Sequence, residues 1–356
     1  MFVREVLDGL ARRDDLAVTA FAISWRGRSR LEATVPDGIP VRSRPVPARL
    51  ARPAWARGNH PDAEWLAGPC DVVHGPNHVT PPGGGATELV TVHDLTALRY
   101  PEMVTDDVRR WPSLLERSLE RGAWIHTVSH AIAAEVREQW PHAADRVVAI
   151  PNGFRRPPAP AEGSDAARGR RLAGGERYVL ALSTVEPRKD LPALVAAFDR
   201  IASADPDLRL VIAGPDGWGV NALLEALDRS PHRRRIRRLN WVGAADRWAL
   251  LRGASVVAYP SVYEGFGLVP LEALAAGTPV VATRIPTTEE VVGEDAALLV
   301  PAGDPDALAE ALQVTLADEF AAAARVSAGQ ARVDAYDWDR TADAIADLYH
   351  RIANPL

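Results

Sequence analysis

Two glutamates, Glu264 and Glu272, lie eight positions apart around a glycine-rich turn. The segment between them reads Gly-Phe-Gly-Leu-Val-Pro-Leu, and it joins the apolar stretch 255–260 to a helical pattern over 269–276. Glycines let a ligand approach the backbone, and the first turn of a helix offers free N–H groups to an anion. A carboxylate can accept hydrogen bonds from two neighbouring sugar hydroxyls. This spacing favours a ligand with phosphates and hydroxyls, with one glutamate for a hexose and the other for a ribose.

Lysine is almost absent from the chain. Lysine and arginine total 41, and only Lys189 is lysine. A GC-rich genome replaces lysine with arginine wherever only charge matters, so this position suggests a need for a compact ammonium group with three donors. A random survivor is the alternative. Lys189 follows Arg188 in the turn after the apolar stretch 178–182.

The first half of the chain places histidines at the ends of apolar stretches. His93 ends one of them and is followed by Asp94, while His74 and Asn77 follow another. An isolated histidine is more often structural than functional. Asp94 is expected to orient the neighbouring loop rather than to ionise in a reaction. For His74 and Asn77, contact with an acceptor and a structural turn remain equal alternatives.

Apolar stretches alternate with amphipathic helical patterns, which predicts parallel α/β units. Prolines, glycines and charges crowd the segment 154–177, as in a linker. We therefore predict two doubly wound, Rossmann-like domains that face a cleft at the carboxyl ends of their strands. The predicted parts are a first domain at 1–155, a linker at 156–176, a second domain at 177–335, and a C-terminal helix at 336–356 that packs back toward the first domain.

The individual elements follow from the same periodicities. The predicted helices cover 2–13, 108–121, 131–139, 191–202, 220–228, 248–252, 269–276 and 340–352. The predicted strands cover 16–24, 41–46, 71–74, 89–93, 124–128, 146–150, 178–182, 209–213, 240–242, 255–260 and 280–283. Ser129 is expected to cap the helix that follows it, and the segment Pro151-Asn152-Gly153 to form a turn that requires a positive φ.

Composition excludes several classes of protein. The length of 356 residues fits two domains at about 150 residues each. A net charge of −6 argues against a nucleic-acid binder. The single cysteine, Cys70, excludes an intramolecular disulfide and a thiolate zinc cage. No apolar stretch approaches the about 20 residues of a membrane-spanning helix. We expect a cytoplasmic two-domain enzyme.

These segments resemble the family-four glycosyltransferases of the GT-B fold. The glutamate spacing from Glu264 to Glu272 matches their E-x7-E signature, and Pro279-Val-Val-Ala-Thr283 follows it as in the family. The Arg188-Lys189 pair resembles their diphosphate-binding segment, although Leu182 and Ser183 occupy positions where some members carry Gly-Arg. The histidine at 93 resembles that of the family's H-D-L segment.

The resemblance implies an enzyme that transfers a sugar from a nucleoside-diphosphate sugar with retention of configuration. Arg188 and Lys189 would reach the leaving diphosphate, Glu264 would hold the donor sugar, and His93 would contact that sugar from the opposite domain. These four residues form the expected catalytic set. The expected donor-binding residues are Glu272 for the ribose and, around the rest of the donor, Gly265, Phe266, Gly267, Leu268, Gly214, Val242 and Gly243.

The segments most resemble bacterial mannosyl- and rhamnosyltransferases of surface polysaccharide synthesis. The resemblance favours GDP-mannose as the donor over UDP-sugars and dTDP-rhamnose, with a saccharide or lipid-linked acceptor. A sugar-nucleotide epimerase of the GT-B fold and a catalytically silent nucleotide-sugar-binding protein are the alternatives. No cofactor and no metal are expected, because the triplets Asp205–Asp207, Asp304–Asp306 and Asp337–Asp339 are typical of turns and helix caps.

The basic run at 232–238 is interpreted as a solvated loop before a buried strand. Its second interpretation is a peripheral contact with the inner face of the membrane, since acceptors in the family are often lipid-linked.

The sequence is also expected to lack the first strand of its first domain. Residues 2–11 resemble the family's first helix, which an apolar strand and a glycine-rich loop precede. In a doubly wound sheet that strand is central, and its loss would leave buried N–H and C=O groups unpaired, at about 1–3 kcal/mol each. A start codon assigned too late is the explanation we favour over a true truncation.

Overall fold

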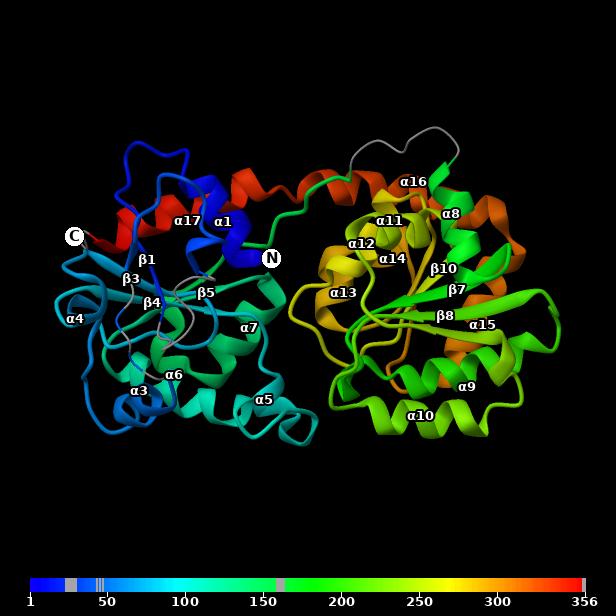
Figure 1. Ribbon diagram of the computed structural model, residues 1–356, viewed down its shortest axis with the longest axis horizontal. Coiled ribbons are helices and arrows are strands. Elements are labelled where there is room, and N and C mark those ends of the chain that lie inside the picture. The colour runs from blue at the N-terminus through cyan, green and yellow to red at the C-terminus, as the bar shows by residue number, and fades with distance from the viewer. Residues whose placement is uncertain (23–30, 43, 45, 47, 158–163, 354–356) are drawn as a thin grey trace. The chain divides into compact units, whose positions relative to one another are not determined.

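Figure 1 shows the computed structural model, which describes residues 1–22, 31–42, 44, 46, 48–157 and 164–353. The chain divides into two compact units. Unit 1 comprises Met1–Gly153 and Tyr336–Leu356, and unit 2 comprises Phe154–Ala335. All ladders between named strands are parallel, which is the α/β architecture that the alternating periodicities predict.

Unit 2 is built on a six-stranded sheet with the order β12-β11-β10-β7-β8-β9. The chain runs from β7 outward to β8 and β9, then returns to the other side of β7 with β10. The two loops that leave β7 and β10 therefore start next to each other at a topological switch point, where open α/β sheets bind ligands. The strands are β7 (Arg177–Leu182), β8 (Leu208–Ala213), β9 (Ile236–Leu239), β10 (Val256–Tyr259), β11 (Val280–Thr283) and β12 (Leu298–Val300).

Helices cover both faces of this sheet (Figure 1). Helix α9 shows why the layers hold, because Leu194 and Phe198 are fully buried in the main core with strand residues such as Leu210. Burying each such side chain contributes about 1.5–3 kcal/mol. The helices are α8 (Ser164–Ala173), α9 (Leu191–Ala202), α10 (Val220–Arg229), α11 (Ala244–Gly253), α12 (Leu268–Ala275), α13 (Pro286–Val291), α14 (Gly293–Ala296), α15 (Pro305–Ala317) and α16 (Glu319–Ala335), with the 3₁₀ turns η4 (Pro187–Lys189) and η5 (Arg233–Arg235).

Unit 1 has a four-stranded sheet with the order β3-β4-β5-β6 and a separate two-stranded ladder, β1-β2. Its strands are β1 (Ala20–Phe21), β2 (Val41–Arg42), β3 (Val72–Gly75), β4 (Thr87–Val92), β5 (Trp124–Thr127) and β6 (Val147–Ala149). Its helices are α1 (Phe2–Leu10), α3 (Ala48–Trp55), α4 (Ala63–Ala67), α5 (Thr96–Arg99), α6 (Trp111–Glu120), α7 (His130–Gln139) and α17 (Trp338–Ala353), with the 3₁₀ turns η1 (Pro101–Met103), η2 (Val108–Arg110) and η3 (Pro141–Arg146).

The first strands of unit 1 can be compared with the expectation that the sequence lacks the first strand of this domain. Residues 1–19 are all described, and they contain helix α1 and no strand. Within the described residues, the strand predicted at 16–24 is represented by β1 and the strand predicted at 41–46 by β2, and these two short segments pair with each other. Residues 23, 24, 43 and 45 of those predictions lie outside the described residues. Whether a strand precedes the sequence stays a prediction.

Helix α17 closes one side of unit 1, where it lies along α1 (Figure 1). Its Trp338, Ile345 and Ile352 are buried in one apolar cluster with Phe2 and Val6 of α1. The 3.6-residue period of apolar positions in both helices explains this contact, because each presents a single apolar stripe. The C-terminal segment from 336 is therefore part of unit 1.

Two predictions about unit 2 are wrong. The segment predicted as a linker, 156–176, contains helix α8, which packs against α11. Ion pairs, including Arg168 with Asp246 at 2.6 Å, link charged residues of this polar segment to α11. The strand predicted at 240–242 lies instead at Ile236–Leu239, so part of the basic run forms the edge strand β9 rather than a loop. Ile236 is buried there while its arginine neighbours reach solvent.

Gly153 serves close packing rather than a positive φ. Its φ is not positive, in contrast to glycines such as Gly122, so the predicted turn requirement is wrong. A Cβ atom at Gly153 would overlap the backbone of Asp337 and Trp338, where helix α17 begins. The glycine is needed because two backbone segments of unit 1 meet there.

We predict that Gly153→Ala lowers the free energy of unfolding by about 1–3 kcal/mol, because the added methyl forces α17 away from its cluster. Urea denaturation measures the change. Gly85→Ala is the matched control, since a Cβ there meets no atom within 4 Å. Equal stability of the two variants would contradict the packing role of Gly153.

Candidate active site

The loops that leave β7 and β10 meet at the switch point of unit 2. The first loop ends in the turn η4, Pro187–Lys189, and the second carries Glu264. The N–H of Val262 donates to the carbonyl oxygen of Arg188 at 2.8 Å, which joins the two loops. Asp190 then begins helix α9 in the left-handed conformation, with a φ of 43°, and its carboxylate caps the helix. The turn thus holds its two cations beside the second loop.

Glu264 is the centre of this cluster, with only 6% of its surface exposed. Its carboxylate accepts from both Arg188 and Lys189, so each of its two oxygens binds one cation. Arg188 also donates to Glu186 Oε2 at 2.9 Å. The ammonium of Lys189 lies 5.4 Å from the centre of the Tyr259 ring. The structure therefore brings together three of the four predicted catalytic residues.

The charges of this cluster balance one another. Burial alone would raise the pKa of Glu264, but the charges of Lys189 and Arg188 outweigh it and lower that pKa to about 2. Glu264 is thus ionised at neutral pH. Together with Glu186, the two cations and two carboxylates sum to zero formal charge. An anionic ligand at these cations would therefore compete with Glu264 for them.

Helix α12 begins directly beyond Glu264 and offers a second feature for anion binding. Gly267 precedes the helix with a φ of 110°, a conformation that a side chain would strain. No acidic side chain lies in the first turn of α12, and no side chain caps it. The first N–H groups of a helix have no acceptor within the helix. N–H groups at a helix start can donate to an anion, and the predicted donor-binding residues Gly265, Phe266, Gly267 and Leu268 lie at or just before this start.

Glu272 lies inside α12 and is also 6% exposed. The Nε atom of Arg247 donates to Glu272 Oε2 at 3.0 Å, and Nη2 of the same arginine donates to the same oxygen. Burial raises the pKa of Glu272 above its ordinary value, and the charge of Arg247 opposes this rise. Sequence reasoning missed Arg247, because a single helical arginine in an arginine-rich chain carries no signal of its own.

The other predicted donor-binding residues lie at the ends of β8 and β9, at the same edge of the sheet. Gly214 follows β8, and its N–H donates to the carbonyl oxygen of Leu239 at 3.0 Å. Gly243 begins helix α11, and Val242 before it is half-buried. Trp241 is 76% exposed beside them, which leaves its ring face open to solvent.

In unit 1, His93 follows β4 and lies in a ring of aromatic groups. Its Nε2 atom lies 2.9 Å from the carbonyl oxygen of Pro76, so Nε2 carries the proton and donates. The rings of Phe2 and His78 lie at 5.2 and 5.6 Å, both edge to face. Burial lowers the pKa of His93, so the imidazole is neutral. Asp94 accepts from the N–H of Thr96 at 2.9 Å and thereby orients the start of α5.

His74 is part of a chain of hydrogen bonds whose direction is determined. The Ile150 carbonyl oxygen lies 2.9 Å from His126 Nε2 and can only accept, so His126 Nδ1 must accept from the Thr91 hydroxyl. Thr91 then accepts from His74 Nε2 at 2.7 Å, and His74 Nδ1 accepts from Tyr349 at 2.6 Å. Both nitrogens of His74 are occupied. His74 lies in strand β3 rather than in a turn, and Asn77 is exposed. Contact of either residue with an acceptor stays a prediction.

His78 is a residue that sequence reasoning missed. Its ring stacks on Trp111 with 4.5 Å between centroids, and its backbone has a φ of 60°. Its Nδ1 atom is buried and has no hydrogen-bond partner among the described residues. A positive φ in a non-glycine residue is uncommon and marks local constraint. The only sequence signal was its place four residues after His74.

The remaining motifs have structural roles. The hydroxyl of Ser129 accepts from the N–H of Ile132 at 3.2 Å, which confirms the predicted cap of α7. Asp304 and Asp337 accept from backbone N–H groups at the starts of their helices, and Asp205 does so in a turn, as predicted. The described ranges contain no cluster of three or more His, Cys, Asp or Glu residues arranged for a metal ion.

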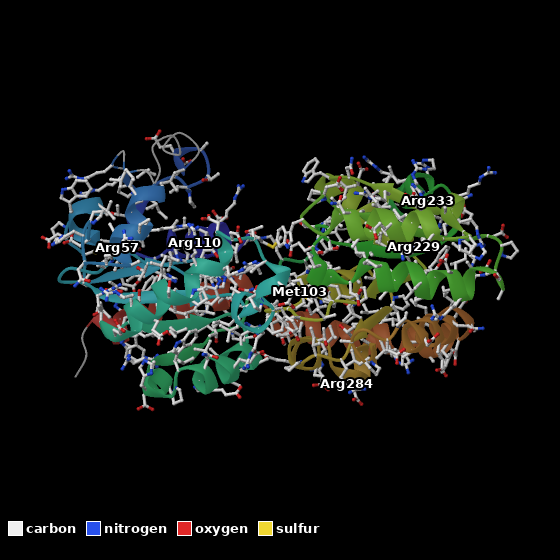
Figure 2. The ribbon with its side chains drawn as sticks, turned by 90° about the horizontal axis from the view of Figure 1, so that it is seen from below. Arg57, Met103, Arg110, Arg229, Arg233 and Arg284 are labelled. Atoms are coloured by element: carbon white, nitrogen blue, oxygen red, sulfur yellow. The ribbon has the colours of Figure 1, made fainter. Side chains whose placement is uncertain are left out.

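The arginines of the basic run at 232–238 differ in their contacts and in their exposure. Arg235 donates to the carbonyl oxygens of Asp205 and Ala202, at 2.7 Å each, and so ties the run to the preceding elements. Arg233 and Arg234 are exposed. Figure 2 shows the side chains of Arg229 and Arg233, which come from α10 and the adjoining turn η5.

Comparisons with known proteins assign the family. Residues 176–318 match the family described as "Glycosyl transferases group 1", and residues 1–155 match "Glycosyltransferase Family 4". The O-antigen chain mannosyltransferase B of Escherichia coli is 30% identical over 304 residues, which are 84% of this chain and 77% of that protein. A phosphatidyl-myo-inositol mannosyltransferase of Mycobacterium leprae is 36% identical over 170 residues, 47% of this chain and 44% of that protein.

Solved structures share the fold. HepE of Anabaena, crystallised with UDP and glucose, has a TM-score of 0.75 at 19% identity and covers 98% of this chain and 94% of its own. WaaG, a glycosyltransferase involved in lipopolysaccharide biosynthesis, has a TM-score of 0.74 at 18% identity, with the same coverage. The chain belongs to the family-four glycosyltransferases, and its two α/β units have the GT-B fold. Within the part of the chain that is described, no helix combines the length and apolar composition needed to cross a bilayer.

We predict that acid weakens unit 1 through His74 and His126. Burial lowers their pKa values to about 3 and about 4, well below the unfolded value of about 6.5. The unfolded chain therefore takes up these protons first as the pH falls. Their contribution is complete above about pH 6.5 and is lost toward pH 4, by about 2 kcal/mol per histidine at pH 5.

Urea denaturation between pH 5 and 7.5 measures this dependence. His126→Gln should flatten the loss of stability toward pH 5, because one of the two groups no longer titrates. The exposed His60→Gln is the matched control and should keep the slope of the parent chain. If His126→Gln shows the same slope as the parent chain, the assignment of neutral buried histidines is wrong.

Proposed function

We propose that this glycosyltransferase moves a hexose from a nucleoside-diphosphate sugar to a saccharide or lipid-linked acceptor, with retention of configuration. One observation carries the proposal. Arg188 and Lys189 both bind the buried carboxylate of Glu264, and helix α12 begins at Leu268, four residues further along the chain. Two cations and a helix start suit a diphosphate, and the neighbouring carboxylates suit the hydroxyls of a hexose and a ribose.

In this proposal, the chain's own groups stabilise the departing diphosphate. Arg188 and Lys189 neutralise the charge that develops on it, and the first N–H groups of α12 donate to its oxygens. Glu264 accepts from hydroxyls of the donor sugar, and Glu272 from those of the ribose. The leaving phosphate assists deprotonation of the acceptor on the same face of the sugar, which accounts for retention without an enzymic nucleophile. The role of His93 toward the sugar is part of the same proposal.

The donor that we favour is GDP-mannose. Two of the relatives are named mannosyltransferases, whereas HepE was crystallised with UDP, which keeps UDP-sugars as the main competitor. We also propose a reaction without a metal ion, because Arg188 and Lys189 supply the positive charge that a metal would otherwise bring. Transfer that persists in EDTA would support this part. The proposal has two further parts. The acceptor belongs to a surface polysaccharide, and the basic run makes a peripheral contact with the inner face of the membrane.

A donor panel tests the proposed function. Ligand binding raises the melting temperature in proportion to RT ln(1 + [L]/Kd), so GDP-mannose, UDP-sugars and dTDP-rhamnose can be ranked by thermal shift. NMR of the best donor without an acceptor then tests for an epimerase, which would convert the donor alone. Calorimetric binding without turnover on any acceptor would favour a silent nucleotide-sugar-binding protein.

We predict that Lys189→Ala lowers kcat/KM for transfer about 10²-fold or more, equivalent to roughly 2.7 kcal/mol of transition-state stabilisation. The reason is the loss of a compact cation at the leaving group. Lys189→Arg should also be impaired, because the guanidinium fork is larger and directs its donors differently. Steady-state kinetics with the best donor give both values. Activity of Lys189→Arg equal to that of the parent chain would contradict the argument from the single lysine.

We predict that Glu264→Gln changes binding and turnover in opposite directions. The neutral amide no longer competes for Arg188 and Lys189, so free nucleoside diphosphate should bind more tightly, by about threefold to tenfold. The rate of transfer should fall, since the contact to the donor sugar is weakened in the transition state. Calorimetry with GDP and UDP, followed by kinetics, separates the two effects. Weaker binding of the nucleotide by this variant would show that Glu264 does not compete with phosphate.

A further inference from the structure

Helix α11 supplies a side chain to the site that the sequence motifs do not point to. Arg247 lies in the first turn and a half of α11, and it reaches Glu272 in α12. Both of its donating atoms, Nε and Nη2, converge on Oε2 of the glutamate. Glu272 Oε1 accepts no hydrogen bond from the described residues. The arginine thus occupies one oxygen of a buried carboxylate and leaves the other available.

Arg247 is the cation that compensates this carboxylate. Helix α12 itself carries no other charged residue. On α11, Asp246 pairs with Arg168, and Arg252 pairs with Asp165.

Among the described residues, the other elements that pack against α12 supply no second charged partner for Glu272. Strand β11 carries no titratable side chain, and Tyr259 of β10 responds to Glu264. On α16, Arg332 and Asp334 pair with other residues. Burial and Arg247 are the two influences on the pKa of Glu272.

The protonation state of Glu272 matters for a ligand with two neighbouring hydroxyls. An ionised carboxylate accepts from both hydroxyls, whereas a protonated one carries a donor and has lost part of its accepting capacity. Burial at 6% exposure favours the protonated form, and a fixed guanidinium opposes it. The geometry also restricts rotation of the carboxylate, because two donors hold one oxygen.

We propose that Arg247 is a positioning residue for the donor nucleotide, which holds Glu272 ionised and presents its free oxygen Oε1 to the ribose hydroxyls. This inference rests on the proposed function, in which Glu272 binds the ribose. Arg247 acts here through Glu272. A purely structural role, as a link between α11 and α12, is the alternative that the experiment must separate.

The test measures the affinity of UDP and GDP alone by calorimetry, for the full chain, from pH 5.5 to 8.5. The Kd of each variant is divided by the Kd of the parent chain at the same pH, so that the effect of titrating the nucleotide itself cancels. Arg247→Gln should weaken binding about tenfold at neutral pH. The ratio should worsen further as the pH falls, because the pKa of Glu272 rises without its cation and a proton competes for the carboxylate. Arg247→Lys should restore part of the affinity, and its affinity ratio to the parent chain should not change with pH.

The glutamate provides the internal control. Glu272→Gln should weaken nucleotide binding by a factor that does not change with pH. The double variant with Arg247→Gln should bind the nucleotide only slightly more weakly than Glu272→Gln alone. Arg252→Gln, on the same helix and paired with Asp165, is the matched control for loss of an α11 ion pair. It should keep the nucleotide affinity of the parent chain at every pH.

Two outcomes would overturn the inference. A ratio for Arg247→Gln that stays constant with pH, is not improved by Arg247→Lys and accompanies a lower melting temperature would assign a structural role. Affinity equal to that of the parent chain at every pH would also overturn it. If Glu272→Gln itself leaves the affinity unchanged, the ribose assignment within the proposed function fails instead, and the two failures are thereby distinguished.

Discussion

The site in unit 2 depends on burying the carboxylate of Glu264 against two cations. A buried ionised carboxylate is costly unless it is paired and hydrogen-bonded, and the pair Arg188 and Lys189 meets both conditions. These ion pairs therefore hold the loop after β10 against the turn after β7. The switch point of the sheet is where these two loops start, so the topology and the charge pairing select the same place.

The same principle recurs at the second glutamate. Glu272 is equally buried, and it meets its cation, Arg247, on the neighbouring helix rather than in the preceding loop. Each buried carboxylate thus has a cationic partner, which lowers the pKa of Glu264 and opposes the rise that burial causes in the pKa of Glu272. In Glu264 the two oxygens are occupied by cations that suit phosphate, whereas in Glu272 one oxygen remains open. This difference supports a phosphate-bearing part of the ligand near the first glutamate and a hydroxyl-bearing part near the second.

Unit 1 contains a buried chain of neutral imidazoles. The imidazoles of His74 and His126 are linked through Thr91, and each hydrogen bond in the chain has one possible direction. A neutral chain of this kind costs little to bury when every member is satisfied. His93 and His78 lie beside it, with fewer partners and more constraint. The hydrogen-bond partners therefore distinguish His74 and His126, whose ring nitrogens are all hydrogen-bonded, from His93 and His78, which are available to a ligand.

Local patterns were enough to predict the parallel α/β architecture, the E-x7-E segment and the Arg188-Lys189 turn, because periodicity and glycine placement are properties of short segments. The caps at Ser129, Asp304 and Asp337 were predictable for the same reason. The pairing of Arg247 with Glu272, the helical state of α8 in a polar segment and the close packing at Gly153 became evident from the three-dimensional structure. These depend on which elements become neighbours in space, and a pairing between distant residues leaves no periodic or local trace in a single sequence.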